Sequence, residues 1–281
     1  MDREMVLLIL SLATVGPVIW MASLLCPQVR SSGTASRNER TAWLSLWAPV
    51  IPAAAMIAAL LGWAMFEPRD AEVVPWTLYP LAITTAYVWA RAIGRACRAL
   101  VVDERAPAYT RGLWRPRTVF CQDLVRRLTP AELEAAQAHE QAHVRHRDPL
   151  RLWMAQWWTD LQWPTRKAHD RFHAWRHALE MARDDEARED GVDGADLAAA
   201  IIAAARFGVP ASAHPQLESG LNDAVLFRTR IERLLVPLHV VPNGSSTPVW
   251  LPIGMATVVI MLVTGEALGE RIVGLVCRTL P

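Results

Sequence analysis

The sequence predicts a mainly α-helical membrane protein in which a polar helical domain is framed by apolar spans. The chain has 281 residues, of which 52% are hydrophobic and only 20% are charged, whereas ordinary soluble domains are less apolar and more highly charged. The charge is also uneven, because 42 of the 57 charged residues lie between Arg91 and Arg233. The net charge of +1 argues against a nucleic-acid-binding protein that works by bulk electrostatics.

Four long apolar runs predict membrane spans, because about 20 apolar residues cross a hydrocarbon core of about 30 Å. The first three are Val6 to Cys26, Thr41 to Phe66 and the shorter run Val73 to Ala90. The fourth begins at Val249 and holds Glu266 near its end. A cleaved signal peptide is the alternative for the first run, but the run is long and lacks a small-residue cleavage site, which favours a retained span.

Arginine residues near the spans predict the orientation of the chain in the membrane. They gather between the first two spans and directly after the third: Arg30, Arg37, Arg40, Arg91, Arg95 and Arg98. These sides are expected to be cytoplasmic, which places the N-terminus outside. We therefore expect three transmembrane helices in residues 1–90, a cytoplasmic domain in residues 91–240, and a fourth transmembrane helix with a short outer tail in residues 241–281.

The sharpest chemical signal is an HExxH motif formed by His139, Glu140 and His143. Residues i and i+4 share a helix face, so both imidazoles can bind one zinc ion, and Glu140 can take a proton from a zinc-bound water. Residues 129–132 predict the required helix, because they form a capping box with proline at the first helical position. The helix is expected to end near Asp148, which precedes a proline. The alternative is a solvated helix face that carries two histidines by chance.

A second predicted helix, residues 168–189, carries the candidate third ligand. Glu180 and Asp184 lie four residues apart on one face. Glu180 can complete a His₂Glu zinc site, and Asp184 can orient a ligating histidine by bonding its ring. The alternative for both is a charged, solvated face. Three histidines of the same helix are a rival ligand set whose role stays open: His169, His173 and His177.

Two further segments are candidates for contact with a substrate. The segment from Arg117 to Phe120 is a candidate edge strand, where Arg117 and Val119 would meet a peptide added as an extra strand. Ordinary sheet packing explains the same residues equally well. Arg230 is a candidate for support of a transition-state oxyanion, and a salt bridge at the helix surface is the alternative.

The run of residues 128–150, which contains the HExxH motif, resembles the BlaR/MecR-type membrane zinc metallopeptidases. Residues 112–120 resemble the strand segment that precedes the zinc helix in that family, residues 180–184 its Glu-x-x-x-Asp element, and residues 230–235 its closing segment. Three spans before the protease domain and one after it also resemble the layout of the family. We expect one departure, namely that no penicillin-binding sensor domain follows the last span.

The resemblance implies a gluzincin-like zinc peptidase domain with a small β-sheet, in which His139, His143 and Glu180 bind Zn²⁺ and Glu140 is the catalytic base. It implies an endopeptidase of the bacterial cell membrane that acts in regulatory proteolysis or signal transduction. The expected partners are the lipid bilayer and a cytoplasmic or membrane-proximal protein substrate, such as a transcriptional repressor, with no direct contact to nucleic acid. The alternatives are a non-catalytic receptor or scaffold of the same fold and an HtpX-type quality-control protease.

Overall fold

The computed structural model describes residues 3–26, 33–66, 74–100, 108–206, 220–237 and 254. Within them the protein is mainly helical, with one two-stranded sheet. The elements in chain order are α1 (Arg3–Leu25), α2 (Ala35–Trp47), α3 (Val50–Phe66), η1 (Trp76–Leu78), α4 (Tyr79–Arg98), β1 (Ala108–Arg111), β2 (Arg117–Phe120), α5 (Gln122–Val125), α6 (Pro130–Arg145), α7 (Asp148–Leu161), α8 (Arg166–Glu189), α9 (Gly194–Arg206) and α10 (Gly220–Leu234).

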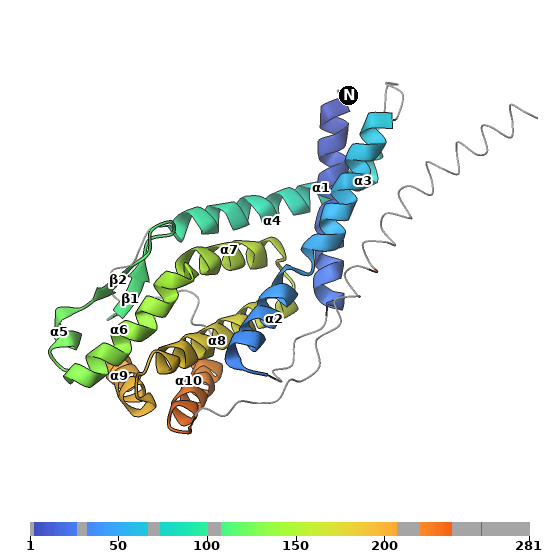
Figure 1. Cartoon of the computed structure of the whole chain (residues 1–281). Coiled ribbons are helices and arrows are strands. Elements are labelled where there is room, and N and C mark those ends of the chain that lie inside the picture. Colours follow the sequence, from blue (N-terminus) through green and yellow to red (C-terminus); the bar gives the residue numbers. More distant parts are fainter. Residues whose placement is uncertain are drawn as a thin grey trace, which may run out of the picture.

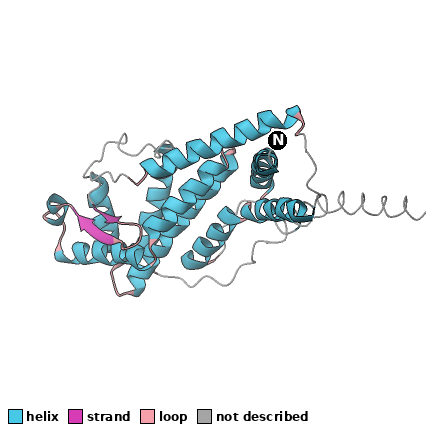
Figure 2. Cartoon of the chain, turned by 90° about the horizontal axis from the view of Figure 1, so that it is seen from above, coloured by secondary structure: helices cyan, strands magenta, loops and turns pink. Residues whose placement is uncertain are grey.

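Helices α1 and α3 stand side by side and project from one end of a helical body (Figure 1). The sheet lies near the opposite end of that body, beside α6 (Figure 1), and the view from above also shows it far from the projecting helices (Figure 2). Helix α4 runs across the body and meets α1 closely: a Cβ atom on Gly16 would lie 2.1 Å from the hydroxyl oxygen of Thr85. Glycine at position 16 therefore permits the approach of the two helices.

Two stretches of the described residues are long and apolar enough to cross a membrane, Met5–Leu25 and Ala35–Gly62. They coincide with the first two spans predicted from the sequence, and the second stretch includes both α2 and α3. The third predicted span, residues 73–90, is not among the candidates found in the described residues. Its helix is α4, which begins only at Tyr79 and carries three arginines in its last eight residues. The fourth predicted span lies outside the described residues, apart from residue 254.

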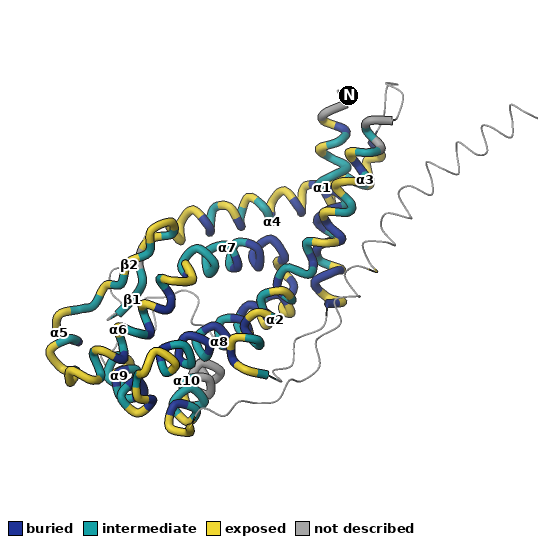
Figure 3. The backbone as a smooth tube through the Cα atoms, in the orientation of Figure 1, coloured by how far each residue is buried: buried dark blue, intermediate teal, exposed yellow. Residues whose placement is uncertain are grey.

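The hydrophobic core lies where α2, α7 and α8 meet below α1. Buried residues are concentrated along α8 and the C-terminal half of α7 (Figure 3). Trp175 of α8 is completely buried, and the indole nitrogen of Trp158 on α7 donates a hydrogen bond to the carbonyl of Leu46, 2.9 Å away. Residues of α1 join the same cluster, so the apolar helices and the polar body share one core.

The beginning and the end of α6 agree with the sequence prediction. Thr129 and Glu132 form the predicted capping box, in which each side chain bonds the backbone of the other residue. Helix α6 ends at Arg145, and α7 begins at Asp148. The break is made by Arg147, whose φ of 52° places it in the left-handed region. This turn redirects the chain, so Asp148 lies beside the helix that has just ended.

Strands β1 and β2 form an antiparallel hairpin with Thr110 opposite Thr118. Gly112 has a φ of +96° in the turn, and a Cβ atom there would lie 2.9 Å from the carbonyl oxygen of Arg115. The predicted strand of residues 117–120 is confirmed. Its residues alternate between exposed and half-buried, which is typical of a sheet with one solvated face.

Candidate metal centre

The HExxH helix α6 and helix α8 bring three metal-ligating side chains together. The Nε2 atoms of His139 and His143 are 3.2 Å apart. The carboxylate oxygens of Glu180 lie 3.6 Å from Nε2 of His139 and 3.9 Å from Nε2 of His143. All three ligand atoms lie within 4.8 Å of one another. The predicted ligands, which come from two segments of the sequence, therefore point to one common centre.

The spacing of these atoms fits a zinc ion. Tetrahedral zinc with bonds of about 2.0–2.1 Å separates its donor atoms by about 3.3 Å. The observed separations of 3.2, 3.6 and 3.9 Å, the last two to different oxygens of Glu180, lie within about 0.6 Å of this value. Three protein ligands leave a fourth position for water or substrate, which is the arrangement of catalytic zinc sites.

A buried carboxylate lies behind each histidine ring. Oδ2 of Asp148 is 2.8 Å from Nδ1 of His143, and Oδ1 of Asp184 is 3.0 Å from Nδ1 of His139. The second contact has the distance of an ion pair but not the angle of a good hydrogen bond. Both carboxylates are almost completely buried. Such partners fix the tautomer and orientation of a ligating imidazole, so both rings present Nε2 to the centre.

The role of Asp148 could not be seen in the sequence, where it marked only the end of a helix. The left-handed turn at Arg147 returns its carboxylate to His143. Arg183 of α8 donates two further hydrogen bonds to it, at 2.6 and 3.1 Å. Burial alone would raise the pKa of Asp148, but its bonds to His143 and Arg183 outweigh burial and lower this pKa to about 2. The carboxylate therefore stays charged at any physiological pH.

Arg230 of α10 binds both acidic side chains of the predicted Glu-x-x-x-Asp element. Its guanidinium donates to both oxygens of Asp184 at 2.8 Å and lies 3.0 Å from an oxygen of Glu180. The structure thus shows the salt bridge that was the alternative reading of Arg230, but its partners are a buried carboxylate, Asp184, and a half-buried one, Glu180. Burial raises the pKa of Glu180, but the Arg230 charge and the bond from His139 hold it well below the ordinary value.

The carboxylates of Asp184 and Glu180 also change the pKa of His139. Burial lowers its pKa, but the negative carboxylates of Asp184 and Glu180, which face the ring, outweigh burial and raise the pKa to about 9. Before any metal binds, the ring is therefore held as an imidazolium between two carboxylates. A metal ion that occupies the centre must displace this proton, since only the neutral ring can ligate.

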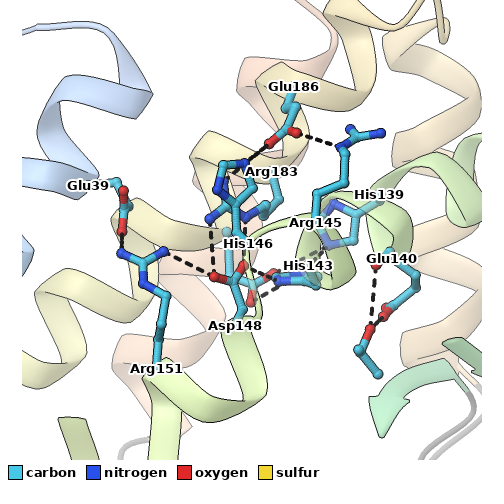
Figure 4. Close-up of polar contacts among 12 residues, drawn as sticks. Glu39, His139, Glu140, His143, Arg145, His146, Asp148, Arg151, Arg183 and Glu186 are labelled. Atoms are coloured by element: carbon cyan, nitrogen blue, oxygen red, sulfur yellow. Dashed lines mark hydrogen bonds and ion pairs between the residues drawn. The ribbon is translucent and has the colours of Figure 1, made fainter. Parts of the chain in front are cut away.

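Glu140 lies on the other side of the histidines from Asp148 (Figure 4). The hydroxyl of Thr110 on β1 donates a 2.7 Å hydrogen bond to Oε2 of Glu140. This contact joins the sheet to the HExxH helix and fixes the carboxylate. Sequence reasoning missed Thr110, because nothing in the local sequence of β1 signals a contact with a residue 30 positions away.

The structure does not bring the other candidates to the centre. Arg117 and Val119 are exposed on β2, and their role in strand addition stays a prediction. The histidines of α8 are absent from the metal-ligating group that the described residues form. The His173 ring instead lies edge-on to Phe172, while burial and the nearby Arg230 charge lower the pKa of His177.

Residues 100–189 match the family model described as BlaR1 peptidase M56. This segment is similar to the M56 peptidase family. The resemblance seen in the sequence is therefore confirmed over these residues, which include the sheet, α6, α7 and α8. Helices α1 to α3 and α10, which supplies Arg230, lie outside the matched segment. A search of curated proteins and a search of solved structures gave no match.

Proposed function

We propose that this M56 domain is a gluzincin-like, zinc-dependent endopeptidase. The observation that carries the proposal is the convergence of His139, His143 and Glu180 within 4.8 Å. The buried carboxylates behind both rings support it, because a charged, solvated helix face would have no need of them. The position of Glu140 next to this centre supports hydrolysis over a purely structural metal site.

Each residue of the site has a distinct task in this proposal. A bound zinc ion would supply a water of lowered pKa and would polarise the carbonyl of the peptide bond. Glu140 would take a proton from the attacking water and pass it to the leaving amine. Because Thr110 holds Oε2 of Glu140, Oε1 is the atom that we expect to carry the proton. Arg230 balances the charge of Glu180 and Asp184, which would otherwise repel each other.

We further propose that the enzyme is an integral membrane protein with four spans, an outer N-terminus and a cytoplasmic domain in residues 91–240. The candidate spans Met5–Leu25 and Ala35–Gly62 support its anchoring in the bilayer. The arginines after residue 90 support the orientation. A protease held in this way would act on a cytoplasmic or membrane-proximal protein, and a regulator such as a transcriptional repressor is the proposed substrate.

The decisive experiment compares the wild type with Glu140→Gln, both purified in detergent at full length. Bound zinc is measured by mass spectrometry, and cleavage is measured on a library of quenched fluorescent peptides. We expect one zinc ion per chain in both proteins and a loss of cleavage of about 10²–10⁴-fold in the variant. Glu134→Gln is the matched control, because Glu134 is exposed on the same helix.

Three results separate the candidate functions. A wild type that binds no zinc refutes the enzyme proposal. Zinc binding without cleavage that depends on Glu140 would favour a receptor or scaffold. Cleavage of many unfolded membrane proteins without preference would favour an HtpX-type quality-control protease over a regulatory one.

A further inference from the structure

A chain of buried polar contacts leads away from the metal centre to helix α2. It begins at His143, whose ring contacts Asp148. Arg151, one turn further along α7, donates a 3.0 Å hydrogen bond to the other oxygen of Asp148. The second amino group of Arg151 binds Glu39 of α2. Figure 4 shows the sequence of contacts from Glu39 to His143 as one line of dashed bonds.

The outer end of this chain is enclosed by aromatic rings. The guanidinium of Arg151 lies over the rings of Trp43 and Trp175, at 4.8 and 5.6 Å from their centroids. The indole nitrogen of Trp175 also donates a hydrogen bond to Glu39. Glu39 is 9% exposed. A charge pair with so little contact with water is stronger than a surface pair, and loss of one partner leaves a buried charge without compensation.

Each carboxylate oxygen of Asp148 contacts two side chains, and these side chains belong to different helices. Oδ2 contacts His143 and Arg183, while Oδ1 contacts Arg183 and Arg151. Arg183 comes from α8, the helix that also carries Glu180. Among the described partners of Asp148, Arg151 is the one that also binds α2. The carboxylate that orients His143 therefore responds both to the peptidase body and to the position of α2.

Helix α2 is joined to the membrane-associated part of the chain. It ends at Trp47, and α3 begins at Val50. The two helices together form the second candidate span, Ala35–Gly62. Helix α2 also packs on α8 through the contacts of Trp43 with Trp175. A shift of α2 and α3 would move Glu39 relative to Arg151, and would thus change the hydrogen bond from Arg151 to Asp148.

We propose that Glu39 and Arg151 are positioning residues that couple the placement of α2 on the peptidase body to the orientation of His143 in the metal centre. This inference rests on the proposed zinc site, and it adds a route by which the membrane segments control that site. The coupling must be reciprocal, because a site that alters metal affinity is itself altered when the metal binds. Metal binding should therefore stabilise the contact of α2 with α7 and α8.

The first test measures zinc affinity by competition with a chromogenic chelator, on the full chain in detergent. Loss of an outer partner of a metal ligand typically weakens binding by about 10–100-fold, and we expect this for Asp148→Asn. Arg151→Met and Glu39→Gln act one step further out, so we expect about 3–10-fold for each. The double variant should be no weaker than Arg151→Met, because both residues act through the same bond.

The matched control is Arg126→Met, which removes an exposed ion pair with Asp123 outside this chain of contacts. It should leave zinc affinity unchanged. The second test measures hydrogen exchange of α2 in the wild type with and without zinc. We expect zinc to slow exchange in residues 35–47, and we expect Arg151→Met to abolish this effect. Glu39→Gln has the shape of the native side chain and provides the test if Arg151→Met does not fold.

Two results would overturn the inference while the proposed function stands. One is wild-type zinc affinity in both Glu39→Gln and Arg151→Met, beside the expected loss in Asp148→Asn. The other is a loss of affinity without any effect of zinc on exchange in α2, which would mark a merely structural contact. A wild type that binds no zinc would instead refute the proposed function itself.

Discussion

Zinc binding should release a proton from His139, and the size of this effect follows from the contacts of the ring. The carboxylates of Asp184 and Glu180 raise its pKa to about 9 against the burial that would lower it, compared with 6.5 for an ordinary histidine. The difference corresponds to about 3 kcal/mol in favour of the imidazolium. The proton must leave before Nε2 can bind the metal.

The number of protons that His139 releases on zinc binding depends on the pH. At pH 8 a group with a pKa of about 9 is about 90% protonated, whereas one with a pKa of 6.5 is about 3% protonated. The wild type should therefore release almost one proton from His139 for each zinc ion bound at pH 8. For the same reason its apparent zinc affinity should fall about 50-fold between pH 9 and pH 7 from this group alone.

The assay is isothermal titration calorimetry of zinc binding at pH 8 in two buffers of different ionisation enthalpy. Asp184→Asn is the informative variant, because asparagine cannot stabilise the imidazolium and because Arg230, which binds Asp184, is left beside the ring. We expect this variant to release less than half as many protons from His139. Asp185→Asn is the control, since Asp185 pairs with Arg233 instead.

The comparison between variants removes the contribution of the zinc-bound water, whose ionisation releases a proton in all three proteins. Equal proton release by the wild type and Asp184→Asn would refute the reasoning. It would mean that Asp184 does not hold His139 in its charged form in the metal-free protein.

Two further predictions concern stability. Burial opposes the charge of Asp148, but its bonds to His143 and Arg183 lower its pKa from the ordinary 3.8 to about 2. The charged carboxylate therefore contributes about 2 kcal/mol to the free energy of unfolding at pH values above 3.8, and this contribution is lost as the pH falls through 2. Acid unfolding of Asp148→Asn, followed by circular dichroism, should therefore be less pH-dependent between pH 4 and pH 2. Gly194→Ala should lower the free energy of unfolding by about 1–3 kcal/mol, because its Cβ would lie 2.2 Å from the carbonyl oxygen of Leu234. Gly94→Ala has open space around the added atom and should be neutral or slightly stabilising; equal melting temperatures for the two variants would contradict the described packing of α9 against Leu234.

The parts of the site that could be predicted are those that depend on short-range spacing. His139 and His143 share a face because helical periodicity puts residues i and i+4 together. The capping box at Thr129 marked the start of that helix through its own side-chain chemistry. The third span at residues 73–90 stays a prediction. The structure adds that α4 packs through a face of small residues and that its end carries arginines.

Most of the contacts that sequence reasoning missed join segments that are distant along the chain. Thr110 reaches Glu140 across 30 positions, and Arg151 reaches Glu39 across 112. Arg230 was singled out, but the sequence could not say that it binds Asp184, 46 positions away. Asp148 is nearby in sequence and was still missed, because its return to His143 depends on a left-handed turn at an arginine, which no local preference predicts.

The sequence by itself determined the chemistry of this protein: an HExxH pair on a capped helix, a carboxylate on a second helix, and apolar segments before both. These features follow from local propensity and periodicity, which act within a few residues. Only the tertiary structure decided how the ligands are held, since the packing of α6 against α8 sets the distance of Glu180 from the two histidines. It also decided which groups lie behind the site, because burial and charge depend on every segment packed around Asp148 and Asp184.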